Sequence, residues 1–473
     1  MKPALIWFRR DLRLTDNPAL LAACAHAAVI PVYLHCPDEE GHWRAGAASR
    51  WWLHHSLEAL AEQLEKRGSR LVIRRGDDSL ALLRQLVAET GAEAVHWNRL
   101  YEPALRDRDS TIKQALREAG ITAESHNAAL LREPWMVKNQ SGGPYRAFTP
   151  FWRAAGRTAF ATPRERPETV PVPSAWPDGE RPAALGLLPR IRWDEGLAAS
   201  WQPGEAGAWQ RLQDFLKERL AGYDERRDLP AVDGTSGLSP HLHFGEIGPR
   251  QVAAAAETMP ADDDRNSFLS EIGWREFAHH LLFQNPQMPD EPLDQRFRHF
   301  PWADDQETLL RAWQRGQTGI PIVDAGMRQL WATGWMHNRV RMVVGSLLTK
   351  NLRVPWQRGE AWFWDTLVDA DLASNSMGWQ WIQGSGADAA PYFRIFNPVR
   401  QGERFDPEGD YVRRWVPELK RLPAKHIHAP WQAPADVLRQ ARVRLGDDYP
   451  HPIVDLADSR RQALDAYGVI KSA

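Results

Sequence analysis

The chain has 473 residues, of which 43 % are hydrophobic and 25 % are charged, and its formal net charge is −2. This composition is that of a folded globular protein with two or three domains, and it argues against disordered chains and membrane proteins. The sequence opens on the short apolar segment Ala4–Phe8, and no later stretch is apolar enough to span a bilayer. The two cysteines, Cys24 and Cys36, suit a reducing compartment. We therefore expect a cytoplasmic protein that does not bind membranes.

Tryptophan is unusually frequent, with 23 residues, many of them after position 270. Core packing rarely needs so many indoles, which makes stacking surfaces or electron carriers worth considering. Because the net charge is close to zero, a surface that binds nucleic acid would have to arise from local segregation of basic residues.

From the first residue to about position 130, short apolar runs alternate with longer amphipathic segments. The short runs are typical of strands: Ala4–Phe8, Val29–His35, Leu71–Arg74 and Ala94–Trp97. Helical spacing of apolar residues marks the segments between them: Ser49–Arg67, Ser79–Thr90 and Arg106–Ala119. The alternation predicts a doubly wound α/β domain with a parallel sheet over residues 1–130. No Gly-x-Gly-x-x-Gly follows the first strand, so this domain need not hold a dinucleotide.

Residues 131–202 are predicted to connect this domain to a second one. Seven prolines lie between Pro163 and Pro189, a density that neither a helix nor a central strand tolerates. Residues 203–473 then show a helical pattern, which predicts an all-α C-terminal domain. The clearer helical segments are Trp209–Ala221, Pro249–Glu257, Ser267–Phe283, Thr308–Gln314, Val323–Gly334, Asn338–Asn351 and Gly359–Leu367.

Between Arg328 and Arg358 the sequence carries six basic residues and no acidic one, interleaved with Trp331, Trp335 and Trp356. This pattern fits a surface that faces phosphates. A solvated helix face with long basic side chains explains it equally simply.

The turn Gly234–His241 places glycine, serine and threonine ahead of a helical run. Its backbone N–H groups and hydroxyls are suited to a pyrophosphate, although most such turns only cap a helix. Glu271, Trp274 and Arg275 share one helix face, and so do Asn338 and Met342. Such side chains would grip a flat pyrimidine pair by its edges and faces, while an intrahelical ion pair and core packing are the structural alternatives.

The segment Asp369–Trp381 mixes acids, amides and indoles and is too polar for a buried helix. Asn375 and Trp379 lie four residues apart, so a helix would place the amide beside the indole. A loop remains an equal alternative.

Taken together, these segments resemble the photolyase/cryptochrome family, and most closely its class I photolyases for cyclobutane pyrimidine dimers. The resemblance runs from Trp7 to Leu419. Its most specific stretches are Gly234–Ser239, Trp274–Phe277, Gly319–Arg328, Gly334–Met342 and Asp388–Pro398. The family fold implies that FAD binds within the helical C-terminal domain.

The resemblance implies roles for a set of flavin-binding residues. They are Tyr223, Thr235, Ser236, Gly237, Leu238, Ser239, Arg275, Arg341, Asp369, Asp371 and Asn375. Arg341 is expected to pair with Asp369 beside the flavin ring, and Asn375 is expected to face its N5. A neutral amide favours a reduced, anionic flavin because a second negative charge would oppose it.

The resemblance also implies a chain of indoles, Trp379, Trp356 and Trp302, that passes electrons inward to reduce the flavin. Core packing is the alternative for each. The lesion pocket and the adjoining DNA surface are expected to comprise Glu271, Trp274, Asn338, Met342, Trp381, Arg227, Arg339 and Gln401. Stacking on Trp274 and Trp381, at about 1–3 kcal/mol each, would offset the cost of flipping the dimer out of the duplex. Excited reduced flavin is then expected to lend one electron that opens the cyclobutane ring.

Cyclobutane dimers are the expected substrate, because Asn338 and Met342 stand where the (6-4) enzymes of the family use histidine chemistry. A second, light-harvesting chromophore is expected near residues 36–48, more readily methenyltetrahydrofolate than a deazaflavin, with His42, Trp43, Arg44 and Glu102 as candidates. An unfilled antenna site is the alternative. No metal is expected, and the protein is expected to act as a monomer on damaged DNA. A cryptochrome-type photoreceptor is the alternative function.

Overall fold

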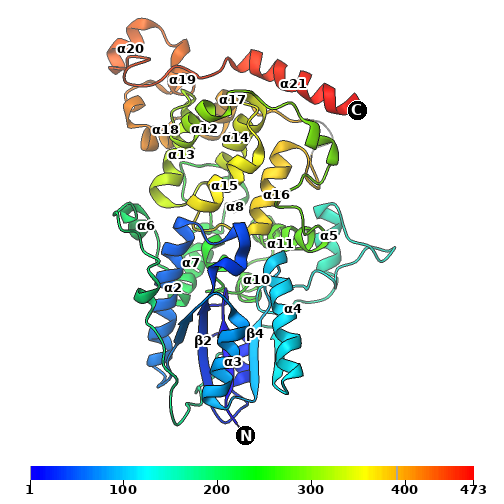
Figure 1. Ribbon diagram of the computed structural model, residues 1–473. Helices are drawn as coiled ribbons and strands as arrows, with labels where there is room; N and C mark the ends of the chain where they lie inside the picture. Colours follow the sequence, from blue (N-terminus) through cyan, green and yellow to red (C-terminus); the bar gives the residue numbers. More distant parts are fainter. Residues whose placement is uncertain (1, 390–392, 473) are drawn as a thin grey trace. The chain divides into compact units, whose positions relative to one another are not determined.

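The computed structural model describes residues 2–389 and 393–472, and the chain forms two compact units. The first unit contains residues 1–218, 236–286 and 368–373, and the second contains residues 219–235, 287–367 and 374–473. Figure 1 colours the chain along its sequence. In the motif Asp388–Pro398, residues 390–392 lie outside the described residues. Each unit is described here by itself.

The first unit is built on a five-stranded, fully parallel sheet. Its strands are β1 (Ala4–Phe8), β2 (Val29–His35), β3 (Val72–Arg75), β4 (Ala94–Asn98) and β5 (Thr122–His126), in the order β3-β2-β1-β4-β5. Ala4 pairs with Val29 on one side and with Ala94 on the other. The prediction of a doubly wound parallel sheet is confirmed, and strand β5 was missed because its sequence is mostly polar.

Helices cover both faces of this sheet (Figure 1). On one face, Ile6 packs with Leu20 of α1 (Pro18–Ala23) and Leu57 of α2 (Ala47–Glu65). On the other face, Trp7 packs with Leu83 of α3 (Ser79–Thr90) and Leu116 of α4 (Pro103–Glu118). Because successive strand residues point to opposite faces, the nearly continuous apolar sequence of β1 serves both cores.

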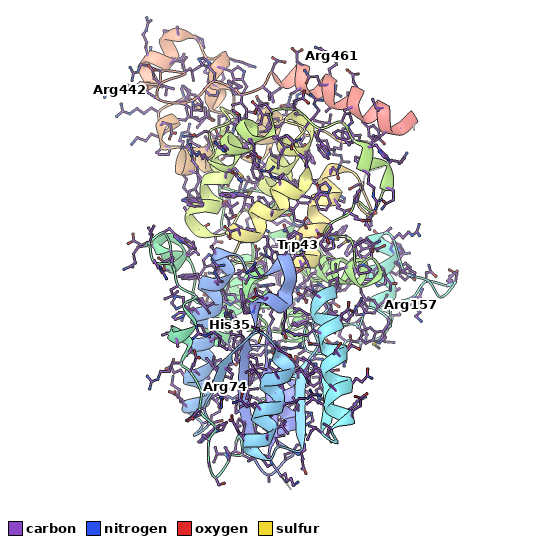
Figure 2. All side chains as sticks on the ribbon, in the orientation of Figure 1. His35, Trp43, Arg74, Arg157, Arg442 and Arg461 are labelled. Atoms are coloured by element: carbon purple, nitrogen blue, oxygen red, sulfur yellow. The ribbon has the colours of Figure 1, made fainter. Side chains whose placement is uncertain are left out.

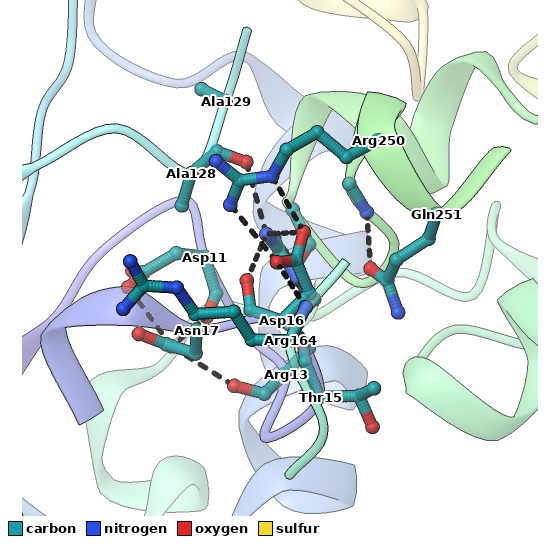
Figure 3. Close-up of polar contacts among 12 residues, drawn as sticks. Asp11, Arg13, Thr15, Asp16, Asn17, Ala128, Ala129, Arg164, Arg250 and Gln251 are labelled. Carbon is teal, nitrogen blue, oxygen red and sulfur yellow. Dashed lines mark hydrogen bonds and ion pairs between the residues drawn. The ribbon is translucent and has the colours of Figure 1, made fainter. Parts of the chain in front are cut away.

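A buried ionic network follows β1 and ties distant parts of the first unit together (Figure 3). Asp16 accepts hydrogen bonds from Arg250 Nη2 at 3.0 Å and from the backbone N–H of Arg164 at 3.0 Å. Arg13 donates to the carbonyls of Ala128 and Gly245 at 2.9 and 2.8 Å. The segment that follows β1 therefore has a structural role.

The rest of the first unit is irregular or helical. Its other helices are α5 (Phe148–Ala155), α6 (Glu195–Ser200), α7 (Glu205–Asp214), α9 (Ser239–His243), α10 (Pro249–Glu257) and α11 (Asp263–Gln284). The proline-rich connector runs along the sheet edge, where the N–H of Glu180 donates to the carbonyl of Ile73 at 2.9 Å.

The second unit is helical where the structure describes it. Its helices are α8 (Tyr223–Arg226), α12 (Gln306–Gln314), α13 (Pro321–Thr333), α14 (Asn338–Ser346), α15 (Trp356–Thr366), most of α16 (Leu372–Gln383), α17 (Pro398–Phe405), α18 (Asp410–Trp415), α19 (Ala424–Ile427), α20 (Ala435–Ala441) and α21 (Leu456–Ser472). None of the helices in the described part of the chain is long and apolar enough to cross a membrane.

Motif Gly319–Arg328 builds the start of α13. Buried Asp324 accepts hydrogen bonds from the backbone N–H groups of Thr318 and Gly319 at 2.7 and 3.0 Å. The Tyr449 hydroxyl also donates to Asp324, at 2.6 Å. The carboxylate therefore joins the turn before α13 to the C-terminal segment, and this motif has a structural role.

Candidate functional site

The residues predicted for the site fall into both compact units. The first unit holds Ser236, Gly237, Leu238, Ser239, Glu271, Trp274, Arg275, Asp369 and Asp371. The second holds Tyr223, Arg227, Thr235, Trp302, Asn338, Arg339, Arg341, Met342, Trp356, Asn375, Trp379, Trp381 and Gln401. The predicted pairing of Arg341 with Asp369 stays a prediction, because the two residues belong to different units.

The turn before α9 has the composition of a phosphate-binding turn. Gly237 adopts φ 61°, and a Cβ atom there would lie 2.7 Å from Nη1 of Arg211. Arg211 lies on α7, and its guanidinium packs 4.7 Å over the Trp201 ring. Small hydroxyl groups and a guanidinium at one turn are the donors that a pyrophosphate needs. Sequence analysis missed Arg211, because nothing in the pattern of α7 marks this residue.

Two buried carboxylates, Asp369 and Asp371, lie beside hydrogen-bond donors in the same unit. Asp369 accepts one from the Ser239 hydroxyl at 2.7 Å. Asp371 lies 3.5 Å from Nε2 of His279 and 3.9 Å from Nδ1 of His243. Burial alone would raise the pKa of Asp371, but His279, His243 and Arg275 hold it well below its usual range. Asp371 is therefore ionised at neutral pH.

Arg10 lies in the negative electrostatic field of Asp371 and of two further carboxylates, and sequence analysis did not predict it. Its guanidinium hydrogen-bonds to Glu102 and lies 3.7 Å from Oε2 of Glu40. Although burial opposes it, the charges of Glu102, Glu40 and Asp371 raise the pKa of Arg10. Glu102, predicted as an antenna residue, thus has an ion-pair partner within the protein.

The other antenna candidates lie around the end of a short 3₁₀ segment, Pro37–Trp43, and Figure 2 labels Trp43 among them. The rings of His42 and Trp43 are 5.0 Å apart, and Arg44 Nη1 lies 3.2 Å from Oδ1 of Asp38. His42 and Arg44 are exposed and Trp43 is half-buried. Their antenna role stays a prediction.

Helix α11 presents Glu271 and Trp274, both partly exposed. The indole of Trp274 stacks on the Phe148 ring, with centroids 3.9 Å apart and planes 11° apart. Phe148 lies on α5, inside the predicted connector, so sequence analysis missed it. Arg275 donates to the carbonyl of Ala129 at 2.7 Å. The stack fixes the plane of Trp274, as a platform for a flat ligand requires.

In the second unit, most of the segment Asp369–Trp381, for which helix and loop were equal alternatives, is helical. Asn375 lies on this helix, α16. The amide of Asn375 donates to the carbonyl of Glu360 at 3.1 Å, and Ser376 donates to the Glu360 carboxyl group at 2.5 Å. Burial raises the pKa of the Glu360 carboxyl group well above its ordinary value. The hydrogen bond to the backbone carbonyl of Glu360 orients the Asn375 amide. Sequence analysis missed Glu360, because no local motif marks this residue.

Trp379 and Trp356 are buried, whereas Trp302 is partly exposed. The Trp379 ring lies 5.0 Å from that of Phe363 and 6.1 Å from that of Trp313, and it packs directly on the backbone of Gly359. Gly359 lies one turn after Trp356 on α15. The buried indole N–H of Trp379 has no hydrogen-bond partner among the described residues. Trp302 packs on Phe300 at 4.7 Å.

The residues expected to face DNA are partly exposed or exposed. Asn338 is exposed at the start of α14, and Arg339 pairs with Asp228 at 2.5 Å while its guanidinium lies 4.3 Å over Phe405. The remaining contacts are Arg339 with Met342 Sδ at 3.8 Å, Arg227 over Tyr223 at 5.5 Å, Arg341 with the Met336 carbonyl at 2.8 Å, Trp381 with the Asp388 carbonyl at 3.1 Å, and the Gln401 N–H with the Asn397 carbonyl at 3.0 Å.

The basic run between Arg328 and Arg358 contributes less positive surface than its sequence suggests. Arg328 pairs with Glu418, and Arg358 with Glu307, each at 2.7 Å. Lys350 is buried, and its ammonium donates to the carbonyl of Arg394 at 2.8 Å. These residues serve the protein's own structure.

Comparison with known proteins identifies the family. Residues 4–173 match the DNA photolyase family model, and residues 268–469 match the FAD binding domain of DNA photolyase. The chain is 50% identical to the deoxyribodipyrimidine photo-lyase of Agrobacterium fabrum over 99% of this chain and 98% of that protein. It is 42% identical to cryptochrome-1 of Arabidopsis thaliana over 98% of this chain and 70% of that protein.

Among solved structures, a bacterial class III photolyase from Agrobacterium tumefaciens superposes with a TM-score of 0.96 at 50% identity, covering 100% of this chain and 98% of that one. The chain therefore belongs to the photolyase/cryptochrome family. The narrower resemblance to class I is not confirmed, since this structural relative is a class III photolyase.

Proposed function

We propose that this protein is a photolyase that uses FAD and light to split cyclobutane pyrimidine dimers in DNA. The observation that carries the proposal is the 50% identity, over nearly the full length of both chains, to a protein named deoxyribodipyrimidine photo-lyase. When bound, reduced FAD would supply, on excitation by light, the electron that opens the cyclobutane ring and then returns.

The residues of the first unit suit FAD. Ser236, Gly237, Leu238 and Ser239 would hold the pyrophosphate with Arg211 as a nearby cation. The Asp369 and Asp371 carboxylates would accept hydrogen bonds from donors of the cofactor, and Arg275 would add positive charge. In the second unit, Tyr223, Thr235, Arg341 and Asn375 complete the proposed set. The amide of Asn375, oriented by Glu360, adds no negative charge beside a reduced flavin.

The lesion would stack on Trp274, whose plane Phe148 fixes, while the Glu271 carboxyl group binds a polar edge of the bases. Asn338, Met342 and Trp381 would complete the lesion pocket, and Arg227, Arg339 and Gln401 would contact the DNA backbone. Trp302, Trp356 and Trp379 would carry electrons to the flavin. A buried indole N–H without an acceptor, as at Trp379, would keep its proton when the ring loses an electron.

Three finer assignments belong to the same proposal. A light-harvesting chromophore would bind the first unit near His42, Trp43 and Arg44, methenyltetrahydrofolate before a deazaflavin. The protein would act as a monomer, and it would work in the cytoplasm, because its two cysteines are both free thiols.

The first test is an absorbance spectrum of the purified protein, followed by near-UV and blue illumination with an oligonucleotide that contains a cyclobutane thymine dimer, under reducing conditions. We expect flavin bands and light-dependent recovery of thymine absorbance, with no recovery in the dark or on a (6-4) oligonucleotide. Flavin bands without repair would instead indicate a cryptochrome-type photoreceptor. A protein that binds no flavin would overturn the proposal.

Glu271→Ala should lower the repair yield while the flavin content is unchanged, because the carboxyl group contacts the lesion and not the cofactor. Glu257→Ala is the matched control, since Glu257 is an exposed carboxylate at the end of α10. Equal repair by both variants would remove Glu271 from the lesion pocket.

A further inference from the structure

Three side chains of the two last strands in the sheet converge on one face. His96 lies on β4, and Glu124 and His126 lie on β5. The parallel register pairs His96 with Glu124 and Asn98 with His126. Since residues two apart in a strand point to the same side, all three side chains share the face that α1 covers. Their nearest ligand atoms lie within 4.8 Å of one another.

A hydrogen-bond relay determines which nitrogen of His96 carries its proton. A carboxylate can only accept, so the 3.2 Å contact between Glu93 and His26 places the proton of His26 on Nδ1. In the neutral form of His26, Nε2 carries a lone pair and accepts from His96 Nε2 at 3.3 Å. In the neutral ring, His96 Nδ1 is then left with a lone pair.

This lone pair faces a second acceptor. His96 Nδ1 lies 3.7 Å from Oε2 of Glu124. Both His96 Nδ1 and His126 Nε2 are buried and have no hydrogen-bond partner among the described residues. Two buried imidazole nitrogens that have no hydrogen-bond partner among the described residues, beside a carboxylate oxygen, are stabilised by a cation placed among them.

We propose that His96, Glu124 and His126 form a binding site for a divalent transition-metal ion, with Zn²⁺ as the ion of best-matched ligand chemistry. Two imidazoles and one carboxylate are a common zinc ligand set, and a water would fill the fourth position. The hydrogen bond of His96 to His26, supported by Glu93, is the outer contact that orients such a ligand. Sequence analysis expected no metal, because these ligands are separated by up to 30 residues and match no short motif.

The site has room to adjust, and three cations lie near it. Two ligands of a tetrahedral zinc ion lie roughly 3.3 Å apart, so ligand atoms that lie within 4.8 Å of one another must close by up to about 1.5 Å. The side chain of Glu124 is 52% exposed and is free to rotate toward the two rings. The cations Lys113 and Arg99 bind the hydroxyl of Ser125, which points to the opposite face of the sheet. Arg99, Arg164 and Lys113 all act electrostatically on His126.

The test is calorimetric titration of the untagged full-length protein with ZnCl₂, with Co²⁺ as a spectroscopic probe above 500 nm. We expect one Zn²⁺ to bind at this site, and Glu124→Gln and His126→Gln each to weaken binding by roughly tenfold or more. Thermal unfolding without zinc shows whether each variant is folded. Zinc should raise the melting temperature of the wild type and not that of Glu124→Gln.

Glu58→Gln is the matched control, because His54, His55 and Glu58 form the other group of ligand type in the described residues. If the proposal is correct, Glu58→Gln binds zinc at the site of His96, Glu124 and His126 with the same affinity as the wild type. Unchanged affinity in both Glu124→Gln and His126→Gln, binding lost in Glu58→Gln alone, or no binding by the wild type would each overturn it. None of these readouts depends on flavin or repair.

Discussion

Tyr449 donates a 2.6 Å hydrogen bond to Asp324, across 125 residues of sequence. Both side chains are fully buried, so their contact joins the start of α13 to the C-terminal segment without water. Tyr449→Phe leaves a buried carboxylate with one donor fewer and should lower the free energy of unfolding by about 1–3 kcal/mol. Chemical denaturation of the variant, of Asp324→Asn and of the double variant measures the coupling. Additive effects of the two changes would contradict the contact.

Trp379→Phe should block the light-driven reduction of oxidised flavin, because phenylalanine does not give up an electron as readily as an indole. Repair by chemically reduced enzyme should remain largely intact. Absorbance under illumination follows the first reaction, and a dimer-containing oligonucleotide follows the second. Loss of both activities together would show that Trp379 is needed for packing and not for electron transfer.

Gly359→Ala tests the contact that positions Trp379. A Cβ atom at Gly359 would overlap the Trp379 ring, so the indole must shift, and overpacking of this kind costs about 1–3 kcal/mol. Gly378→Ala is the matched control. Gly378 precedes Trp379 on α16, and a Cβ atom there meets nothing within 4 Å. The control should be neutral or stabilised by up to about 1 kcal/mol. Thermal melts compare the two, and equal melting temperatures would exclude close packing at Gly359.

His337 should make the protein sensitive to mild acid. Its Nδ1 accepts the N–H of Arg339 at 3.1 Å and caps α14, and burial lowers its pKa to about 4. The unfolded state binds this proton at about pH 6.5, so stability is full above pH 6.5 and falls toward pH 4, by up to about 3 kcal/mol. His337→Asn keeps the cap without titrating. Denaturation of both proteins at pH 7 and pH 4.5 should show the smaller loss in the variant; identical losses would mean that His337 is not responsible.

The buried ion pair of Asp16 and Arg250 should be costly to break. Arg250→Ala leaves the Asp16 carboxylate buried beside Arg13 with fewer donors and should destabilise the protein by about 3–5 kcal/mol. Arg444→Ala removes an exposed arginine from its pair with Asp448 and should have no measurable effect. Urea denaturation provides the comparison, and similar midpoints for the two variants would contradict the structural role of the network.

Local sequence patterns were enough to predict much of the fold. The bounds of β1 and β2 were predicted correctly because their sequences are apolar on both faces. The edge strand β5 was missed because its polar residues carry no strand signal, and α16 could not be distinguished from a loop.

The site was less predictable for a different reason. Arg211, Phe148 and Glu360 act through Gly237, Trp274 and Asn375, which lie 15 or more residues away in the chain. A motif shows which residues recur together in order, whereas these contacts depend on how distant helices pack. The basic run between Arg328 and Arg358 suggested more positive surface than the structure has for the same reason. The partners of Arg328 and Arg358 are carboxylates that are distant in the sequence.

The first compact unit is assembled from three separate stretches of chain, and this order constrains biosynthesis. Val368, from the last stretch, is fully buried in the core that contains Ile6 and Leu57. At synthesis rates of about 5–20 residues per second, Val368 follows Glu218 by roughly 8–30 s. During that interval the nascent α/β domain has an incomplete core, so chaperone binding and proteolysis should act most strongly on ribosome-bound chains of intermediate length.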